Sequence, residues 1–367
     1  MQGLYIHIPF CVKKCDYCDF LSFSAQDGCF EKYTDALISE MEEYAGDDIS
    51  TVFIGGGTPS VLPSYLMEKI CRSVSEKFNV GKDAEWTAEA NPGTLNDEKI
   101  YTMAKCGINR ISVGVQSFND KELKAIGRIH DAKTAYDTVL DIKKSGISNI
   151  SIDLMASLPY QTRESFRNSL ITAVSLPVSH ISVYSLIIEE NTPIKEKYDT
   201  GVFQMPDDDE DRELYKMTGE YLEEHGFLRY EISNYAKDGF ISRHNMNYWE
   251  CGEYIGIGLG ASSYKNGVRY KNTDNLSDYM NGKNAHTEKE IISKKDKMSE
   301  FMILGLRKTH GISSREFFLR FGLYPENVWG GVIDKFINLG LIMRYGDNYS
   351  LTDKGLDLSN TVMCEFL

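Results

Sequence analysis

Three cysteines lie close together near the start of the chain, in the stretch PFCVKKCDYCDF (9–20). Cys11, Cys15 and Cys18 follow the spacing C-x-x-x-C-x-x-C, whereas the remaining cysteines are scattered. We interpret the scattered ones as small buried or half-buried hydrophobic side chains. The clustered thiolates suit a zinc site, a redox dithiol or an iron–sulfur cluster.

The number of clustered cysteines favours an iron–sulfur cluster over its two rivals. Structural zinc takes four ligands, usually as two close pairs, and Cys29 lies eleven residues beyond Cys18. A dithiol of Cys15 and Cys18 would leave Cys11 without a role. Three thiolates on a 4Fe–4S cluster use every cysteine of the stretch and leave one iron open to a small-molecule ligand.

Other residues able to contact a ligand stand where apolar runs end. FIGGGTPSVL places Gly56, Gly57 and Thr58 after such a run, and glycines let a backbone approach a ligand and expose N–H groups to it. A plain strand-to-helix turn is the alternative. Asp153 stands inside the apolar run SIDLM, where a carboxylate is costly to bury without a partner.

Glu89 in TAEANPGT and Gln116 in SVGVQSF also stand near the ends of apolar runs, and Arg128 in AIGRIH follows Gln116 by twelve residues. An amide and a guanidinium bind hydroxyl and carboxylate groups through directional hydrogen bonds. A solvated edge charge is the alternative for Glu89, and a surface salt bridge is the alternative for Arg128.

The positions above require a sheet that brings strand ends together. Apolar runs at 4–10, 51–57, 85–92, 110–118, 149–159 and 180–188 alternate with segments of helical periodicity. Six strand–helix units predict an α/β fold with a parallel sheet, right-handed crossovers and outer helices. Because eight units close a barrel, we expect an open, partial (β/α)6 barrel of the TIM type, with the site at the carboxyl ends of its strands.

We expect three regions, at 1–188, 189–290 and 291–367. The second begins near Glu189 and contains an acidic helix start, MPDDDEDRELYK (205–216), interpreted as a solvated first turn, followed by strands or glycine turns. The third contains three helices and a hairpin around Gly346-Asp347-Asn348, as in a winged-helix module. Its ten basic and nine acidic side chains favour a structural or docking role over nucleic-acid binding.

Composition excludes several classes of protein. The 367 residues are 42% hydrophobic and 26% charged, which excludes global disorder. A net charge of −14 argues against nucleic acid as the main partner. No apolar run is long enough to span a membrane, and the start MQGLYIHIPF does not read as a signal peptide. We therefore expect a cytoplasmic protein.

The cysteine spacing, with Tyr17 just before the last cysteine, resembles the radical S-adenosylmethionine (SAM) superfamily. The resemblance implies a 4Fe–4S cluster held by Cys11, Cys15 and Cys18, with SAM chelating the fourth iron. It also implies that the glycine segment contacts the methionyl amino group and that Arg128 meets the SAM carboxylate. The implied SAM-binding set is Tyr5, Tyr17, Gly56, Gly57, Thr58, Glu89, Gln116, Arg128 and Asp153.

A wider set of motifs, including GGGTPS, EANPGT, GRIH and YEISNYA, resembles the family of anaerobic coproporphyrinogen III oxidases and their relatives over nearly the whole chain. Two features favour its haem-chaperone branch, known as HemW. Phe20 stands where the oxidases carry a further cysteine, and few residues precede Cys11. The branch motif H-N-x-x-Y-W stands here as HNMNYW, which implies that His244 contacts haem.

This resemblance implies a haem chaperone that passes haem to an apo-haemoprotein, with an electron donor such as a flavodoxin or ferredoxin. Membrane contact is expected only through the acceptor. The alternative is an enzyme, oxygen-independent coproporphyrinogen III oxidase, and a winged-helix regulator is a third class. One departure is Ser157, which stands where the family commonly has glycine and is expected to crowd the strand end.

Overall fold

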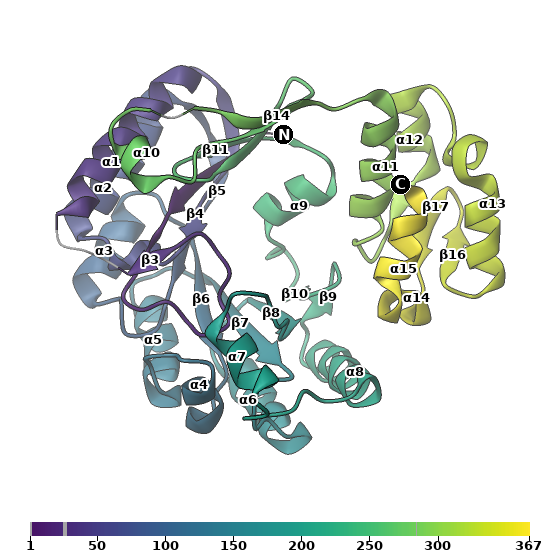
Figure 1. Ribbon diagram of the computed structural model, residues 1–367, viewed down its shortest axis with the longest axis horizontal. Helices are drawn as coiled ribbons and strands as arrows, with labels where there is room; N and C mark the ends of the chain where they lie inside the picture. Colours follow the sequence, from purple (N-terminus) through teal and green to yellow (C-terminus); the bar gives the residue numbers. More distant parts are fainter. Residues whose placement is uncertain (1, 25–27, 284) are drawn as a thin grey trace.

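The structure is a computed structural model that describes residues 2–24, 28–283 and 285–367. In this part of the chain a 12-stranded sheet curves through most of the molecule, with helices on its outer face (Figure 1). Its strand order is β14-β13-β12-β11-β1-β4-β5-β6-β7-β8-β10-β9. One large apolar core lies between this sheet and the helices.

The six predicted strands form the centre of the sheet and are parallel to one another. They are β1 (Gln2–Ile8), β4 (Asp48–Gly56), β5 (Asn79–Ala90), β6 (Arg110–Gln116), β7 (Asn149–Ala156) and β8 (His180–Ser185). Their carboxyl ends therefore meet at one edge of the half-barrel, which is where the sequence places the candidate ligand-binding residues.

Amphipathic helices connect these strands. Each connecting segment forms such a helix because its apolar residues recur at intervals of three and four positions. The main ones are α1 (Cys29–Glu40), α2 (Ser64–Lys77), α3 (Asp97–Lys105), α4 (Asp120–Ala125), α5 (Ala132–Lys144) and α6 (Arg163–Ser175). Short 3-10 turns η1 (Met41–Tyr44) and η2 (Pro59–Val61) follow α1 and β4. Helix α7 (Pro193–Asp199) follows β8.

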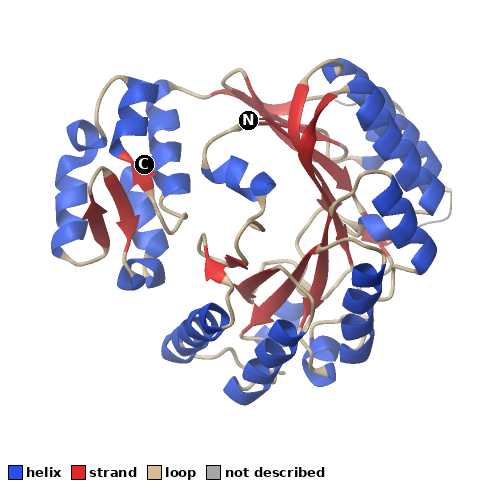
Figure 2. Cartoon of the chain, turned by 180° about the vertical axis from the view of Figure 1, so that it is seen from behind, coloured by secondary structure: helices blue, strands red, loops and turns tan. Residues whose placement is uncertain are grey.

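Residues beyond β8 extend the sheet at both edges and leave it open (Figure 2). At one edge β10 (Asn234–Ala236) runs antiparallel to β8 and carries β9 (Leu228–Arg229). At the other edge β11 (Glu253–Ile257) runs parallel to β1, and an antiparallel meander follows. The meander is β12 (Ser262–Lys265), β13 (Val268–Lys271) and β14 (Thr287–Ile291), with α10 (Leu276–Met280) between β13 and β14. The prediction of an open α/β half-barrel is confirmed.

The last part of the chain has an apolar core of its own. It contains α11 (Lys294–Gly305), β15 (Ile312–Ser313), α12 (Ser314–Phe321), α13 (Pro325–Asn338), β16 (Ile342–Tyr345), β17 (Asn348–Leu351), α14 (Asp353–Asp357), α15 (Ser359–Met363) and η3 (Cys364–Phe366). The hairpin turns at Gly346, whose φ of 58° suits glycine. Helix α9 (Arg243–Trp249) contacts β1 and β4 on one side and α11 on the other (Figure 1).

Two expectations about the region after β7 need correction. The acidic start of α8 (Asp208–Glu224) is not merely solvated, because Asp211 accepts hydrogen bonds from Ser157 and from Ser185, the latter at 2.9 Å. Ser157 has a φ of 60°, which glycine adopts readily, and its hydroxyl is accommodated by Asp211 instead of crowding the strand end.

None of the helices among the described residues combines the length and apolar character needed to cross a membrane.

Candidate cofactor site

The cysteine loop follows directly on β1. Its first part, β2 (Phe10–Cys11), pairs in parallel with β3 (Phe23–Ser24), so the loop returns to its starting point. The thiols of Cys11, Cys15 and Cys18 are free, and their residues are half-buried. The Cys18 N–H donates to the Cys15 carbonyl oxygen at 3.2 Å, which tightens the turn between the last two cysteines.

Asp16 ties this loop to the opposite side of the half-barrel. Its N–H donates to the Ile126 carbonyl at 3.1 Å, and its carbonyl accepts from the Ile194 N–H at 2.9 Å. Its carboxylate pairs with Lys197. These bonds hold the loop in place from α4 and α7, although both helices are remote from it in sequence.

Polar donors surround the cysteine thiols. Thr58 Oγ1 donates to Cys11 Sγ at 3.4 Å, and Arg128 Nη1 donates to Cys15 Sγ at 3.4 Å. Burial raises the pKa of the Cys18 thiol, and the neighbouring Cys15 raises it further. Among the described residues no three His, Cys, Asp or Glu side chains are grouped to hold one metal ion. In a cubane cluster each thiolate binds a different iron, so the three thiols need only border one common space.

The glycine segment at the end of β4 is packed against the start of the cysteine loop. Gly56 has a φ of 106°, and a Cβ there would overlap the His7 ring. A Cβ on Gly57 would lie 2.8 Å from the carbonyl oxygens of both Ile8 and Phe10. Side chains at these two positions would push the cysteine loop away from the strand ends.

The N–H groups of this segment bind protein acceptors, so the expectation that they are exposed to a ligand is wrong for three consecutive residues. The donors and acceptors are Gly56 N to Glu89 Oε2 (3.0 Å), Gly57 N to the Ile8 carbonyl (2.8 Å) and Thr58 N to the Phe10 carbonyl (2.8 Å). The segment therefore positions Glu89 and the cysteine loop relative to each other.

A hydrogen-bonded chain links the glycine segment to Arg128 through Asn91, a residue that the sequence reasoning did not single out. Asn91 Nδ2 donates to Thr58 Oγ1 at 2.8 Å, and Asn91 Oδ1 accepts from Arg128 Nη2 at 2.7 Å. Asn91 lies two residues after Glu89, and alternate residues of an extended chain share one face. This spacing from Glu89 could have identified Asn91 as a residue of the site from the sequence alone. The Arg128 Nε atom is buried without a hydrogen-bond partner.

The space between Arg128 and β6 exists because Gly114 has no side chain and because the backbone at Gln116 has an unusual conformation. A Cβ on Gly114 would lie 2.7 Å from Asn91 Oδ1 and 3.1 Å from Gln116 Nε2. Gln116 itself has a φ of 67°, in the left-handed region, at the end of its strand. Such strained residues persist where the surrounding structure requires them, often at ligand sites.

Two acidic side chains face the interior below this space. Burial raises the pKa of Glu89 to about 7, and the nearby Asp153 adds to this shift, whereas the Gly56 N–H opposes it. Burial also raises the pKa of Asp153, which accepts from Ser112 Oγ at 3.5 Å. Arg110, which is 2% exposed, acts on both carboxyls as a nearby positive charge.

The two candidate tyrosines flank the site. Tyr5 OH and His7 Nδ1 share a hydrogen bond of 2.9 Å, and His7 Nε2 contacts the Leu21 carbonyl at 2.9 Å. Tyr17 packs against an apolar cluster beneath the cysteine loop and lies near Arg128. Tyr5 thus points toward the β1 side of the half-barrel, and Tyr17 toward the β7 side.

His244 lies elsewhere, inside the half-barrel near the beginnings of the strands. The side chain is 1% exposed, its Nδ1 contacts Thr51 Oγ1 at 2.9 Å, and its Nε2 contacts Tyr248 OH at 3.0 Å. The ring also stacks on Phe53 at 5.1 Å. Burial lowers the pKa of His244 to about 3, so the ring is neutral. Both ring nitrogens are engaged, and the predicted haem contact would require one of them to be released.

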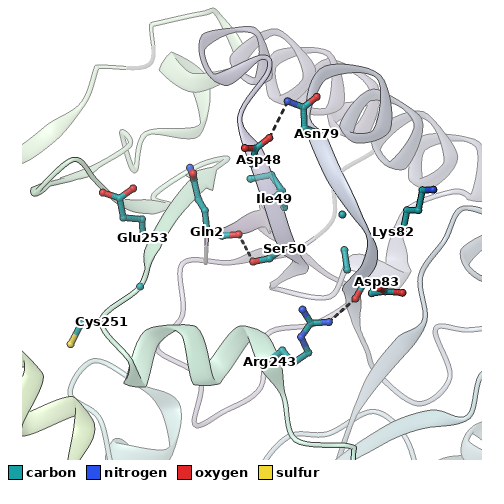
Figure 3. Close-up of a pocket in the computed structure, with 13 residues that line it drawn as sticks. Gln2, Asp48, Ile49, Ser50, Asn79, Lys82, Asp83, Arg243, Cys251 and Glu253 are labelled. Carbon is teal, nitrogen blue, oxygen red and sulfur yellow. Dashed lines mark hydrogen bonds between the residues drawn. The ribbon is translucent and has the colours of Figure 1, made fainter. Parts of the chain in front are cut away.

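Two cavities lie at opposite ends of the strands. One of about 650 Å³ borders the site, and its lining includes Tyr5, Gly56 and Glu89. The other, of about 860 Å³, lies where β1, β4 and β5 begin, and its lining includes Asp48, Lys82 and Arg243 (Figure 3). The first is continuous with the residues that the sequence predicts to bind SAM.

The residues present fit a cluster and a nucleotide-like ligand. Three free thiols, a buried guanidinium nitrogen without a partner and a cradle over Gly114 converge at the carboxyl ends of β1, β4, β5 and β6. Thiolates are the usual ligands of iron–sulfur clusters, and an Arg fork binds carboxylates. The donor set thus matches both groups.

Two protein-family models match the chain: the radical SAM superfamily over residues 5–172 and the HemN C-terminal domain over residues 292–358. Among curated proteins, the Heme chaperone HemW of Lactococcus lactis is 39% identical and covers 100% of this chain and 97% of its own length. The chain belongs to the HemW family. HemW proteins of Bacillus subtilis and Escherichia coli are 35% and 34% identical over 100% of this chain.

The fold of this HemW family member also matches a solved structure. Coproporphyrinogen III oxidase (HemN) from Escherichia coli, a radical SAM enzyme, has a TM-score of 0.88 at 21% identity and covers 100% of this chain. The likeness shows that the half-barrel and the C-terminal module share their arrangement with that enzyme. Together the comparisons confirm the predicted superfamily and its HemW branch.

Proposed function

We propose that this protein is a haem chaperone of the HemW type, which binds a 4Fe–4S cluster, SAM and haem and delivers haem to apo-haemoproteins. The observation that carries the proposal is the full-length similarity to curated proteins named Heme chaperone HemW, at 34–39% identity. The free thiols of the cysteine loop, at the strand ends, support the cofactor part.

In this proposal the residues of the site divide into two sets. Cys11, Cys15 and Cys18 hold the cluster, which supplies one-electron chemistry when bound. Around SAM, Arg128 binds the carboxylate through its free nitrogen, and Asn91 fixes the orientation of the guanidinium. The remaining contacts come from Tyr5, Tyr17, Gly56, Gly57, Thr58, Glu89, Gln116 and Asp153.

Anaerobic reconstitution tests the cofactor part of the proposal. We expect the wild-type protein to contain iron and sulfide and to bind SAM, and Cys15→Ala to lose both metal and sulfide. Cys364→Ala is the matched control, because Cys364 is an exposed thiol outside the loop. Zinc in place of iron, or equal iron in wild type and Cys15→Ala, would contradict the assignment.

Haem transfer tests the chaperone part. The protein, loaded with haem, is mixed with an apo-haemoprotein, and the absorption spectrum of the acceptor is followed. An electron donor such as a flavodoxin or ferredoxin is added in a parallel reaction. The rival activity is measured directly by incubation with coproporphyrinogen III, SAM and reductant, and formation of protoporphyrinogen would replace the chaperone by an oxidase.

A further inference from the structure

Arg110 is a buried cation on the inner face of the half-barrel whose guanidinium has no partner among the described residues. It is the first residue of β6, it is 2% exposed, and its Nε atom has no hydrogen-bond partner. No carboxylate of residues 2–24, 28–283 and 285–367 forms an ion pair with it. Because an unpaired charge is costly to remove from water, such a group indicates a site where a ligand supplies the partner.

The register of the sheet places a second polar group without a partner beside Arg110. Ser112, two residues later on β6, donates to Asp153 inside the half-barrel, and alternate residues of a strand share one face. Thr87 of β5 is aligned with Arg110 in the parallel ladder. Thr87 is fully buried, and its Oγ1 atom also lacks a hydrogen-bond partner. A guanidinium and a hydroxyl therefore lie on adjacent strands and on the same face.

The acids nearest to Arg110 do not neutralise it. Burial raises the pKa of Glu89 to about 7 and also raises the pKa of Asp153, and the positive charge of Arg110 offsets only part of these shifts. Glu85 accepts hydrogen bonds from the first two N–H groups of α9, at 3.0 Å and 3.1 Å. Glu231 lies 3.7 Å from an arginine of the C-terminal module. Each acid is thus held toward its neutral form or engaged elsewhere.

The other groups around Arg110 are neutral rings, and one of them reaches solvent. Both ring nitrogens of His180 and of His244 already have hydrogen-bond partners. Burial lowers the pKa of both histidines, and the positive charge of Arg110 lowers it further. Tyr230 lies near both Arg110 and Tyr184. Tyr184 is 42% exposed, so solvent and small molecules can enter along the β8 side.

We propose that Arg110 and Thr87 form a subsite for the carboxylate group of a small organic ligand inside the half-barrel. The guanidinium fork matches the two oxygens of a carboxylate, and the hydroxyl donates one further hydrogen bond. A single positive charge among neutral histidines suits a monoanion better than a doubly charged phosphate. The subsite is separate from Arg128, because Arg110 begins β6 whereas Arg128 follows its end. It is also independent of the proposed delivery of haem.

Ligand-dependent stability of the reconstituted full-length protein tests the subsite. The Tm is measured at rising concentrations of acetate, of its neutral isostere acetamide and of inorganic phosphate, at constant ionic strength, with and without SAM. We expect acetate to raise the Tm in both conditions and acetamide not to, because a ligand that binds only the folded state stabilises it. Equal effects of acetate and acetamide, or an effect of phosphate alone, would overturn the proposal. An acetate effect that SAM abolishes would also overturn it, since the acetate then lies at Arg128.

Two variants assign the effect to the proposed residues. Arg110→Lys keeps the charge but loses the fork, and we expect the Kd of acetate to rise roughly 10- to 150-fold. Thr87→Val keeps the volume but loses the hydroxyl, with an expected rise of roughly 2- to 13-fold. Arg72→Gln is the matched control, because Arg72 lies on α2 and its side chain is 68% exposed. An unchanged Kd in Arg110→Lys, or in Thr87→Val if the first variant does not fold, would show that Arg110 only acts on the neighbouring acids.

Discussion

At the scale of single residues, Asn91 connects two parts of the cofactor site that come from distant strands. Its amide donates to Thr58 and accepts from Arg128, and it thereby relates the glycine segment to the guanidinium. Arg128 also donates to the Gly114 carbonyl and to Cys15 Sγ, but Asn91 is the residue that joins it to Thr58. Asn91 is therefore a sharper probe of site geometry than the glycines, whose replacement would displace the cysteine loop.

We predict that Asn91→Ala weakens SAM binding while the cluster is retained. The loss of one hydrogen bond to a charged group corresponds to about 1.5–3 kcal/mol, or roughly 10- to 150-fold in Kd. Equilibrium dialysis with SAM measures the change, and iron content is the control. Asn91→Asp keeps the acceptor for Arg128 and is expected to bind more tightly than Asn91→Ala. Equal affinity of wild type and Asn91→Ala would contradict the assignment.

A second residue-scale prediction concerns Ser157, which combines a left-handed backbone with a hydrogen bond to Asp211. Ser157→Val is expected to lower the free energy of unfolding by about 2 kcal/mol or more, because a β-branched side chain is strained at positive φ. Ser157→Gly is expected to stay within about 1 kcal/mol of wild type, since relief of strain offsets the lost bond. Denaturant unfolding of both variants checks the order, and the reverse order would show that the backbone conformation differs.

At the scale of elements, the sequence predicted the six central strands because each is an apolar run with helical periodicity on either side. It also predicted which strand ends carry polar residues, because the position of a polar residue relative to an apolar run can be seen directly in the sequence. It did not predict that the N–H groups of Gly56 and Gly57 bind protein acceptors, because those partners belong to other strands. The enclosure of His244 was equally invisible, since it depends on how α9 packs into the half-barrel.

Glu40, at the end of α1, joins the outer helices to the added strands of the sheet. It is 6% exposed and accepts hydrogen bonds from the Gly258 N–H at 2.9 Å, from Asn272 Nδ2 at 2.6 Å and from Tyr279 OH. These donors belong to the segment that follows β11. Burial raises the pKa of Glu40 to about 7 despite these bonds.

The raised pKa predicts a pH-dependent contribution to stability. Because the folded pKa of about 7 lies above the ordinary glutamate pKa of 4.5, the unfolded state ionises first, and stability falls as the pH rises from about 4.5 to 7. Glu40→Gln lacks this term, so its deficit relative to wild type should shrink between pH 5 and pH 8, by about 3 kcal/mol at most. Denaturant unfolding at the two pH values measures the difference, and a constant deficit would contradict the shifted pKa.

At the scale of the whole molecule, two apolar cores must act as one body. Polar contacts join the core of the half-barrel to the core of residues 301–366, among them the Arg269–Glu300 pair and the contacts of Glu231. Glu231 is fully buried, forms a β-bridge with Lys308 and lies 3.7 Å from Arg307, whose guanidinium lies 4.3 Å from the Trp249 ring centre. Trp249 closes the HNMNYW motif, so this junction also supports the helix that carries Tyr248.

We predict that Glu231→Ala loosens the C-terminal module before it affects the sheet. Removing one partner of a fully buried ion pair costs roughly 3–5 kcal/mol, and we expect a smaller cost here because the Arg307 side chain is 27% exposed and water can reach its charge. Hydrogen exchange should accelerate in residues 301–366 and in α9, while the amides of β4 to β7 keep their protection. Glu213→Ala is the matched control, since its pair with Arg163 is 3.2 Å long and both side chains are more than 60% exposed. Uniform acceleration across the sheet would show instead that the two cores unfold as one unit.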